Sequence, residues 1–217
     1  MTVIQSIIGR IQPGRFDEYL ELNRQAIKIH ERLGVSARVF LAGPAGEASG
    51  LSSFSTEHAN MDDYGRYADE VATDGELQSL VMHLRSEKTP VVIEQQSLAS
   101  ELPLGRTPKA GRGPVVEVHV SRPTPGRMEE VLSMGKRVCD FVEAHGALNA
   151  RSFQLGYAGI GSGSLLSMWE FENLRAWGKA SDAWNNDPEG QEIAMSTVAA
   201  NPSTTLVFSG VYMEVPL

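Results

Sequence analysis

The sequence contains one cysteine, Cys139, among 217 residues. A single thiol provides neither an internal disulfide framework nor a cysteine-based zinc site. Basic residues are also in the minority, with 19 Lys and Arg against 27 Asp and Glu. The formal net charge of −8 repels phosphate backbones, which argues against nucleic acid as a partner. No run of 18 apolar residues occurs, so the sequence predicts no membrane-spanning helix.

Signals for export and for common nucleotide sites are missing as well. The N-terminus lacks a basic region followed by an apolar core and a cleavage site, so we expect a cytoplasmic protein. No Gly-x-Gly-x-x-Gly opens a helix after a strand, and no P-loop is present. The Gly-rich stretch 159–164 is expected to join two strands as a hairpin loop. With 41% hydrophobic residues, the chain can nevertheless bury a core of its own.

The chain repeats itself at a nearly constant interval. Pro13-Gly14-Arg15 returns 112 residues later as Pro125-Gly126-Arg127. Further matches have an offset of 113, namely Arg38 with Arg151, Phe40 with Phe153, Glu57 with Glu170, Tyr64 with Trp177 and Asp74 with Asp187. Collinear matches of this kind indicate an internal duplication. We predict a first repeat over 1–100 and a second over 115–217, joined by a Pro- and Gly-rich surface linker over 101–114 whose positive charges favour solubility.

Each repeat predicts the same order of elements. A short β-branched run (3–10, 115–122) precedes a Pro-Gly turn, and apolar residues at helical spacing follow. Two strands, a second helical region (61–86, 172–200) and a last strand complete the unit, with Asp187 and Pro188 beginning a helix. This β-α-β-β-α-β order is that of a ferredoxin-like unit, so we predict an α+β protein. Helices cover only one face of each sheet, so the two bare faces should meet around a small-molecule cavity.

The doubled unit, the Pro-Gly-Arg turn and the stretches Met168–Glu172 and Ala183–Glu189 resemble the dimeric α/β-barrel superfamily. This group includes the antibiotic-biosynthesis monooxygenases and NIPSNAP-type proteins, and the tandem form is similar to the ring-opening oxygenases of angucycline-type polyketides. The resemblance implies tandem ferredoxin-like repeats that form an intrachain dimeric α/β barrel. It also implies an oxygenase acting on a polycyclic aromatic metabolite, with O₂ as co-substrate and either no cofactor or a reduced flavin (FADH2 or FMNH2). Barrels of this kind can bind heme through a histidine, but no helix histidine is clearly axial.

Alternation along the strand at 115–122 predicts which side chains face the cavity. Val116, Val118 and Val120 form one face, which suits the helices. Glu117 and His119 should therefore look into the barrel, as should Gln5 of the first repeat, a predicted substrate contact. We predict His119 and Glu117 as a catalytic acid/base pair. The alternatives are a Glu117 that pairs with an arginine beside a structural His119, and a metal pair for which the spacing shows no third ligand.

The remaining site candidates are cationic and aromatic. Arg151 is predicted to be catalytic by holding an anion, with Arg38 and Phe153 as substrate contacts, although pairing of both arginines at a sheet edge is an equal alternative. All three tryptophans lie in the second repeat, which indicates a pocket for a flat aromatic molecule there. Trp169 and Trp184 are predicted to contact this substrate, while core packing is the alternative and is preferred for Trp177. His30 ends a helix, where a cation suits the helix dipole.

Three functions stay open on this basis. In an oxygenase, His119 would remove a phenolic proton, Arg151 would hold the anion, and the anion or a reduced flavin would pass an electron to O₂. A polyketide cyclase would use the same base without O₂. A non-catalytic binding module would leave the cavity packed. The expected partner is a small aromatic substrate, without a metal, and exposed strand edges are compatible with a homodimer.

Overall fold

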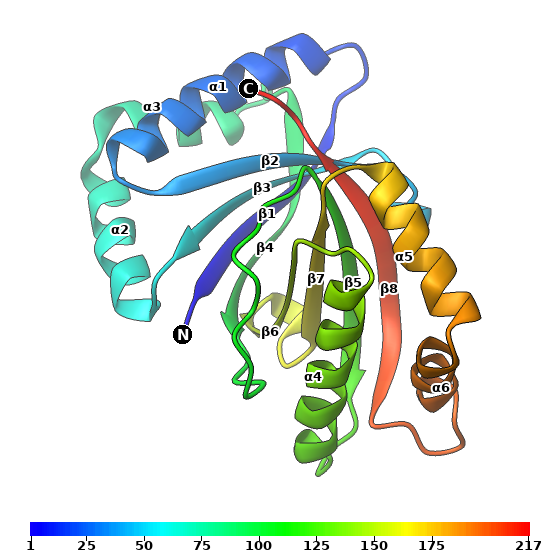
Figure 1. Cartoon of the computed structure of the whole chain (residues 1–217). Helices are drawn as coiled ribbons and strands as arrows, with labels where there is room; N and C mark the ends of the chain where they lie inside the picture. The colour runs from blue at the N-terminus through cyan, green and yellow to red at the C-terminus, as the bar shows by residue number, and fades with distance from the viewer.

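Two βαββαβ units follow one another along the chain in the computed structural model, which describes all 217 residues (Figure 1). The first unit contains β1 (Val3–Ile11), α1 (Phe16–Arg32), β2 (Ser36–Ala42), β3 (Leu51–His58), α2 (Met61–Thr73), α3 (Gly75–Leu84) and β4 (Val91–Glu101). The second contains β5 (Val115–Pro123), α4 (Met128–Ala144), β6 (Asn149–Tyr157), β7 (Leu165–Phe171), α5 (Leu174–Asn186), α6 (Pro188–Thr197) and β8 (Thr204–Glu214). Short 3₁₀ turns, η1 (Gly46–Ala48) and η2 (Gly159–Gly161), lie in the β2–β3 and β6–β7 hairpins.

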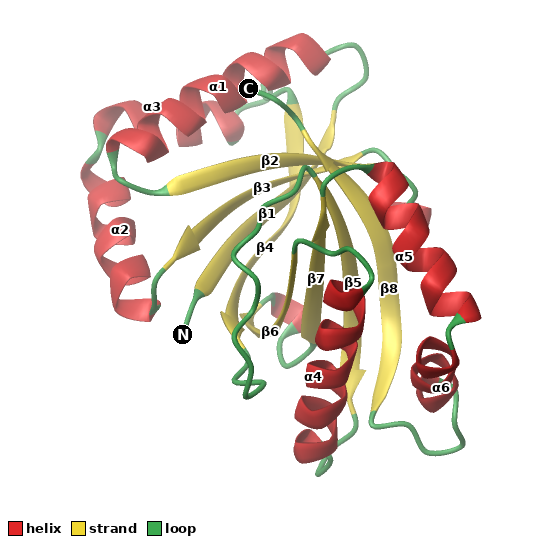
Figure 2. Ribbon diagram, viewed as in Figure 1, coloured by secondary structure: helices red, strands yellow, loops and turns green.

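The eight strands close into one barrel in the order β1-β3-β2-β8-β5-β7-β6-β4. Within each repeat the order is that of a ferredoxin-like sheet, and every pair is antiparallel. Two short contacts join the repeats, β2 with β8 and β4 with β6. The helices lie outside the barrel, α1–α3 over the first sheet and α4–α6 over the second (Figure 2). The predicted α+β class and intrachain barrel are therefore confirmed, and none of the helices is both long and apolar enough to cross a lipid bilayer.

Capping residues explain where the helices of the second layer begin. The carboxylates of Asp74 and Asp187 accept hydrogen bonds from the backbone N–H groups of Leu77 and Glu189, at the starts of α3 and α6. These bonds satisfy donors that the first helical turn leaves free. Asp187 is thus the N-cap predicted from sequence, and Pro188 follows it as the first helical residue.

The repeated Pro-Gly-Arg turn holds each unit together. Nη1 of Arg15 donates to the carbonyl oxygen of Thr89 at 2.6 Å, in the segment that leads into β4. Nη1 of Arg127 donates in the same way to the carbonyl of Asn201, ahead of β8. The arginine of this motif therefore ties the start of the first helix to the entry of the last strand.

The segment between the repeats is packed against the second one. Arg106, whose side chain is only 7% exposed, pairs with Asp140 and Glu143 and donates to the carbonyl of Ala150 at 2.8 Å. A Cβ atom at Gly113 would lie 2.2 Å from the carbonyl oxygen of Phe171, so only glycine fits this approach. The expectation that the positive charges here serve solubility is wrong for Arg106, because its side chain is buried and forms ion pairs with Asp140 and Glu143.

Candidate functional site

The expected cavity between the two sheets is present inside the barrel. Its volume is about 740 Å³, and its walls come from strands of both repeats. Val116, Val118 and Val120 line it from β5, together with Phe40 and Tyr212. This interior is called the lumen below.

The expected facing of β5 is wrong, because the valines face the lumen and Glu117 and His119 lie on the outer side. Glu117 accepts a hydrogen bond from Nε1 of Trp177 on α5 at 2.9 Å, and its other oxygen lies 3.1 Å from Nε2 of His119. The His119 ring packs 4.4 Å from the ring of Trp169, centroid to centroid. Both faces of the strand are enclosed, so alternation gave the correct period but could not decide which face turned inward. Glu117 and His119 line neither the lumen nor the cavity described next.

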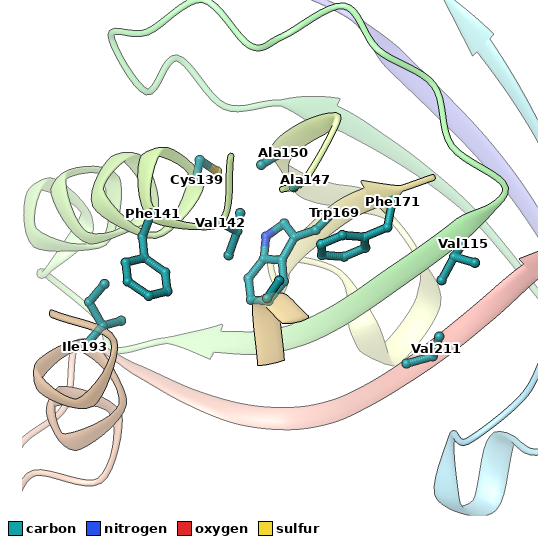
Figure 3. Close-up of a cluster of buried hydrophobic side chains, with 11 residues drawn as sticks. Val115, Cys139, Phe141, Val142, Ala147, Ala150, Trp169, Phe171, Ile193 and Val211 are labelled. Carbon is teal, nitrogen blue, oxygen red and sulfur yellow. The ribbon is translucent and has the colours of Figure 1, made fainter. Parts of the chain in front are cut away.

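Trp169 belongs to a packed core between the sheet and helices of the second repeat (Figure 3), and the partly buried Trp177 and Trp184 pack against this core. The rings of Trp169 and Trp184 are 5.7 Å apart, and Phe141 meets Trp184 edge-on at 5.3 Å. Fully buried Phe171 and Ile193 complete the cluster. A pocket for a flat aromatic molecule was expected here, but the rings of these side chains fill the space themselves. Their predicted contact with a substrate stays a prediction.

A second cavity lies at the corresponding place in the first repeat, between its sheet and α1, α2 and α3. Its volume is about 220 Å³, and it is called the helix–sheet cavity below. Most of its lining is aliphatic or aromatic, and none of it is Asp, Glu, Lys or Arg. The polar side chains in it come from β1, α1, β3, α2 and β4, namely Gln5, Tyr19, Asn23, His30, Ser52, Tyr64, Tyr67 and Gln96.

His30 is the one histidine of this cavity, and its ring is oriented by α1 itself. Nδ1 lies 2.6 Å from the carbonyl oxygen of Ala26, one helical turn earlier. A carbonyl oxygen can only accept, so Nδ1 carries the proton and Nε2 has a free lone pair. Nε2 makes no hydrogen bond within the protein. The rings of Phe54 and Tyr67 pack at 4.9 and 5.7 Å and limit the rotation of the imidazole.

Burial changes the charge expected for His30. The side chain is 6% exposed, and the loss of solvation lowers its pKa, which the hydrogen bond to Ala26 offsets only in part. Burial therefore favours the neutral ring and opposes the cation expected at this helix end. A neutral imidazole with an open Nε2 in an apolar cavity is suited to accept a proton.

Hydrogen-bond donors and acceptors lie in the same cavity as His30. Nδ2 of Asn23 donates to the carbonyl of Tyr19 at 2.8 Å, and Ser52 donates to the carbonyl of Gly9 at 3.0 Å. Burial raises the pKa of Tyr19, so its hydroxyl keeps its proton. Oε1 of Gln5 accepts from Thr56 at 3.5 Å, which leaves the Nε2 amide of Gln5 as a donor toward a ligand. Gln5, a predicted substrate contact, therefore lines a cavity beside a basic nitrogen.

The second repeat has lost this polar set. At the offset of 112, Tyr19, Asn23 and His30 correspond to Val131, Gly135 and Val142. Val131 and Val142 are buried, and Val142 belongs to the tryptophan-containing core. A position-by-position comparison of the two repeats could have singled out His30. Polar residues in one repeat that are apolar at the same positions of the other indicate that the two repeats differ in function there.

Arg38, Arg151 and Phe153 lie at the far end of the lumen, around a space of about 30 Å³. Nη1 of Arg38 donates to Glu170 at 2.8 Å, and Nη1 of Arg151 donates to Glu57 at 2.8 Å. Each arginine also forms an ion pair with a second carboxylate, Arg38 with Glu214 and Arg151 with Glu101. Each guanidinium also lies over a phenyl ring, Arg38 4.7 Å from Phe40 and Arg151 4.9 Å from Phe153.

Each arginine of this network binds acids from the other repeat. We call the six charged residues the inter-repeat ion network; they are Arg38, Glu57, Glu101, Arg151, Glu170 and Glu214. The pairing that was considered as an alternative is therefore observed. Arg151 also borders a pocket of about 450 Å³ beside the segment 101–108. Because two carboxylates already occupy its guanidinium, its predicted anion-holding role stays a prediction.

The residues present do not fit the cofactors that the fold suggests. Flavin phosphates need cationic partners, but the helix–sheet cavity has none and the lumen has one, the exposed Arg122. For heme, His30 has an open Nε2, but about 220 Å³ is below the range of about 300–1,000 Å³ used by drug-sized ligands, and heme is larger still. No group of three or more His, Cys, Asp or Glu side chains could hold a metal ion.

No protein-family model and no curated protein matches the sequence. Solved structures do match. An anthrone oxidase-like protein has a TM-score of 0.62 at 16% identity, covering 99% of this chain and 91% of that one. A protein of Fusobacterium nucleatum subsp. nucleatum assigned as a monooxygenase gives 0.62 at 7% identity, covering 98% and 93%. A chlorite dismutase variant of Candidatus Nitrospira defluvii gives 0.55 at 9% identity, covering 99% and 91%.

The chain has the dimeric α/β-barrel fold. Identities this low establish the fold alone. The coverage extends over both repeats, so the likeness includes the duplicated barrel as a whole.

Proposed function

We propose that the protein is an oxygenase that deprotonates a small aromatic substrate in the helix–sheet cavity, so that the resulting anion can react with O₂. The observation that carries the proposal is the geometry of His30, whose Nδ1 donates to the carbonyl oxygen of Ala26 and whose Nε2 has no hydrogen bond in the protein at the wall of an apolar cavity. Two of the solved structures with this fold are assigned as monooxygenases, and a third is anthrone oxidase-like, which supports the same class of reaction.

The first step is proton transfer to Nε2 of His30 from an acidic C–H or O–H of the substrate. The resulting anion gains hydrogen bonds from neutral donors, the amide of Gln5 and the hydroxyl of Tyr19, in a space with a largely apolar lining. Neutral donors suit an anion formed during the reaction, because a permanent cation would instead favour substrates that arrive charged.

The second step uses the anion itself as the reductant. One electron passes to O₂, and the substrate radical and superoxide combine to form a C–O bond. For a ring methylene, the peroxide takes up a proton and then loses water, which leaves a carbonyl. The balance is one methylene and one O₂ giving one carbonyl and one water, and His30 can return the proton it accepted.

Cavity size and lining define the substrate class. An apolar cavity of about 150 Å³ in another protein holds benzene, so about 220 Å³ has room for an aromatic molecule larger than benzene. Aromatic ketones and phenols of the polyketide type meet this description. The absence of charged side chains from the lining favours an uncharged substrate.

Oxygen uptake with anthrone tests the proposal. Purified protein without added flavin should consume one O₂ per anthrone and yield anthraquinone faster than buffer alone. A dependence on added reduced flavin would contradict the mechanism. Release of a cyclised product from a linear polyketide without O₂ uptake would identify a cyclase, and saturable binding without turnover would identify a binding module.

A further inference from the structure

The lumen is separate from the helix–sheet cavity, because the two lie on opposite faces of the first sheet. Ser6 and Ile8 of β1 line the lumen, whereas Gln5 and Ile7 line the helix–sheet cavity. At about 740 Å³ the lumen lies within the range of roughly 300–1,000 Å³ that is typical of small-molecule sites. The chemistry proposed above makes no use of it.

The lumen is closed at one end and open at the other. Phe40 and Met168 line both the lumen and the small space beside Arg38 and Arg151, so the inter-repeat ion network lies behind its floor. Its other lining residues include the η2 turn, where Ile160 is fully exposed, and Val207, which is 53% exposed. Apolar side chains left in water at the rim of an apolar cavity indicate where a hydrophobic molecule enters.

One wall of the lumen is a row of hydroxyl groups. Oγ of Ser55 lies 3.2 Å from Oγ of Ser6 and 3.3 Å from Oγ of Ser53. Three hydroxyls carry three protons and six lone pairs, and their two mutual bonds leave one O–H and four lone pairs unused. This wall can therefore bind a ligand that has hydroxyl or carbonyl oxygens.

The opposite wall is apolar and partly aromatic. Val116 and Tyr212 lie there, on β5 and β8, with Phe208 and Met168 packed against them, and Phe40, the β2 neighbour of Ser53, joins them in one buried cluster. Planar apolar surfaces of this kind favour a flat ring system. The ionisable side chains with formal charge, Glu94 and Arg122, are exposed, so a charged ligand would lose its hydration without a buried partner.

We propose that the lumen is a second ligand site, which takes a flat, uncharged polycyclic molecule that carries hydroxyl or carbonyl oxygens along one edge. The serine row orients the oxygenated edge, and the valines and aromatic rings cover the apolar edge. The floor behind Phe40 limits how far the molecule can enter.

Titration with 1-hydroxypyrene, followed by the change in pyrene fluorescence, tests the site. We expect saturable binding with one high-affinity molecule per chain. Val118→Trp projects an indole ring into the lumen where the apolar edge of the ligand would lie, and should weaken this binding by about tenfold or more, the equivalent of about 1.4 kcal/mol. Ala68→Phe, which fills the helix–sheet cavity, is the matched control and should leave the affinity within about twofold.

A gentler variant keeps the test decisive if Val118→Trp does not fold. Ser55→Ala removes the central hydroxyl without adding volume, and should weaken 1-hydroxypyrene by several-fold more than pyrene, which has no oxygen. Binding lost with Ala68→Phe but not with Val118→Trp would overturn the proposal. Equal losses for both ligands in Ser55→Ala, or no saturable binding by the folded parent, would also overturn it.

Discussion

The imidazole of His30 differs from that of His119 in what its free nitrogen meets. Nε2 of His119 lies against a carboxylate, on an outer strand face beneath α5, whereas Nε2 of His30 opens toward an apolar cavity. The sequence shows both histidines, but the surroundings of each ring come from residues that are distant in the sequence. The carbonyl that orients His30 is four residues away, yet the cavity depends on side chains from three helices and the sheet.

Exchange of His30 for Gln should lower turnover of anthrone by about 100-fold or more, because the variant lacks the base. Initial rates of O₂ uptake measure the effect. His119→Ala is the paired variant, since the sequence-based assignment of His119 stays a prediction. Loss of activity in His119→Ala and not in His30→Gln would place the chemistry beneath α5.

The pH dependence of the reaction should have an acid limb that belongs to His30. Burial lowers the pKa of this ring below its usual 6.5, so the basic form persists into mildly acidic solution. kcat/KM should be level near neutrality and fall as the pH drops through a value below about 6.5. Stability should decline over the same range, because the unfolded chain takes up this proton more readily than the folded one. A midpoint above 6.5 would contradict the assignment.

The elements themselves were predictable from sequence because their signals are local. The cap Asp187, the Pro-Gly turns and the β-branched runs placed strands and helices within a few residues of their observed bounds, whereas the break at Asp74 between α2 and α3 was not predicted. The facing of β5 was not predictable. In a barrel covered by helices both faces are buried, so Val118 and His119 meet protein on either side, and the polarity difference that normally orients a strand is lost.

Two glycine-to-alanine exchanges should shift stability in opposite directions. At Gly113 the new methyl group would collide with the backbone of Phe171, so we expect a loss of about 1–3 kcal/mol. At Gly178, within α5, nothing lies within 4 Å of the added carbon, and we expect a gain of roughly 0.4–1 kcal/mol. Urea denaturation measures both, and a neutral Gly113→Ala would show that the segment before β5 is not held against β7.

At the scale of the whole molecule, the duplication was the feature that sequence comparison could supply. Equal offsets for Arg38 with Arg151 and Glu57 with Glu170 indicated two equivalent units. The offsets did not show that the charges are exchanged, so that each arginine binds the acid of the other unit. That arrangement follows from the way the two sheets face each other, which requires coordinates.

Removal of one charge from the inter-repeat ion network should destabilise the barrel strongly. Arg38→Met leaves the buried carboxylate of Glu170 without its cation, and we expect a loss of about 3 kcal/mol in the free energy of unfolding. The double variant Arg38→Met/Glu170→Gln should recover part of it, because the buried group at position 170 is then neutral, although Glu214 still lacks its cation. Arg24→Met, in an exposed pair with Glu21, is the control and should change stability by less than about 1 kcal/mol.

The exchange of counter-charges also has a consequence for fragments. A half-chain made alone would keep its arginine but lose both carboxylates that neutralise it, along with the sheet edge that closes the cylinder. Two such halves, produced as separate polypeptides, should therefore complement each other and reassemble. The same exchange of counter-charges would have favoured a homodimer of an ancestor with a single repeat. After duplication and fusion the two copies could differ, so that the second has a packed core where the first has the helix–sheet cavity.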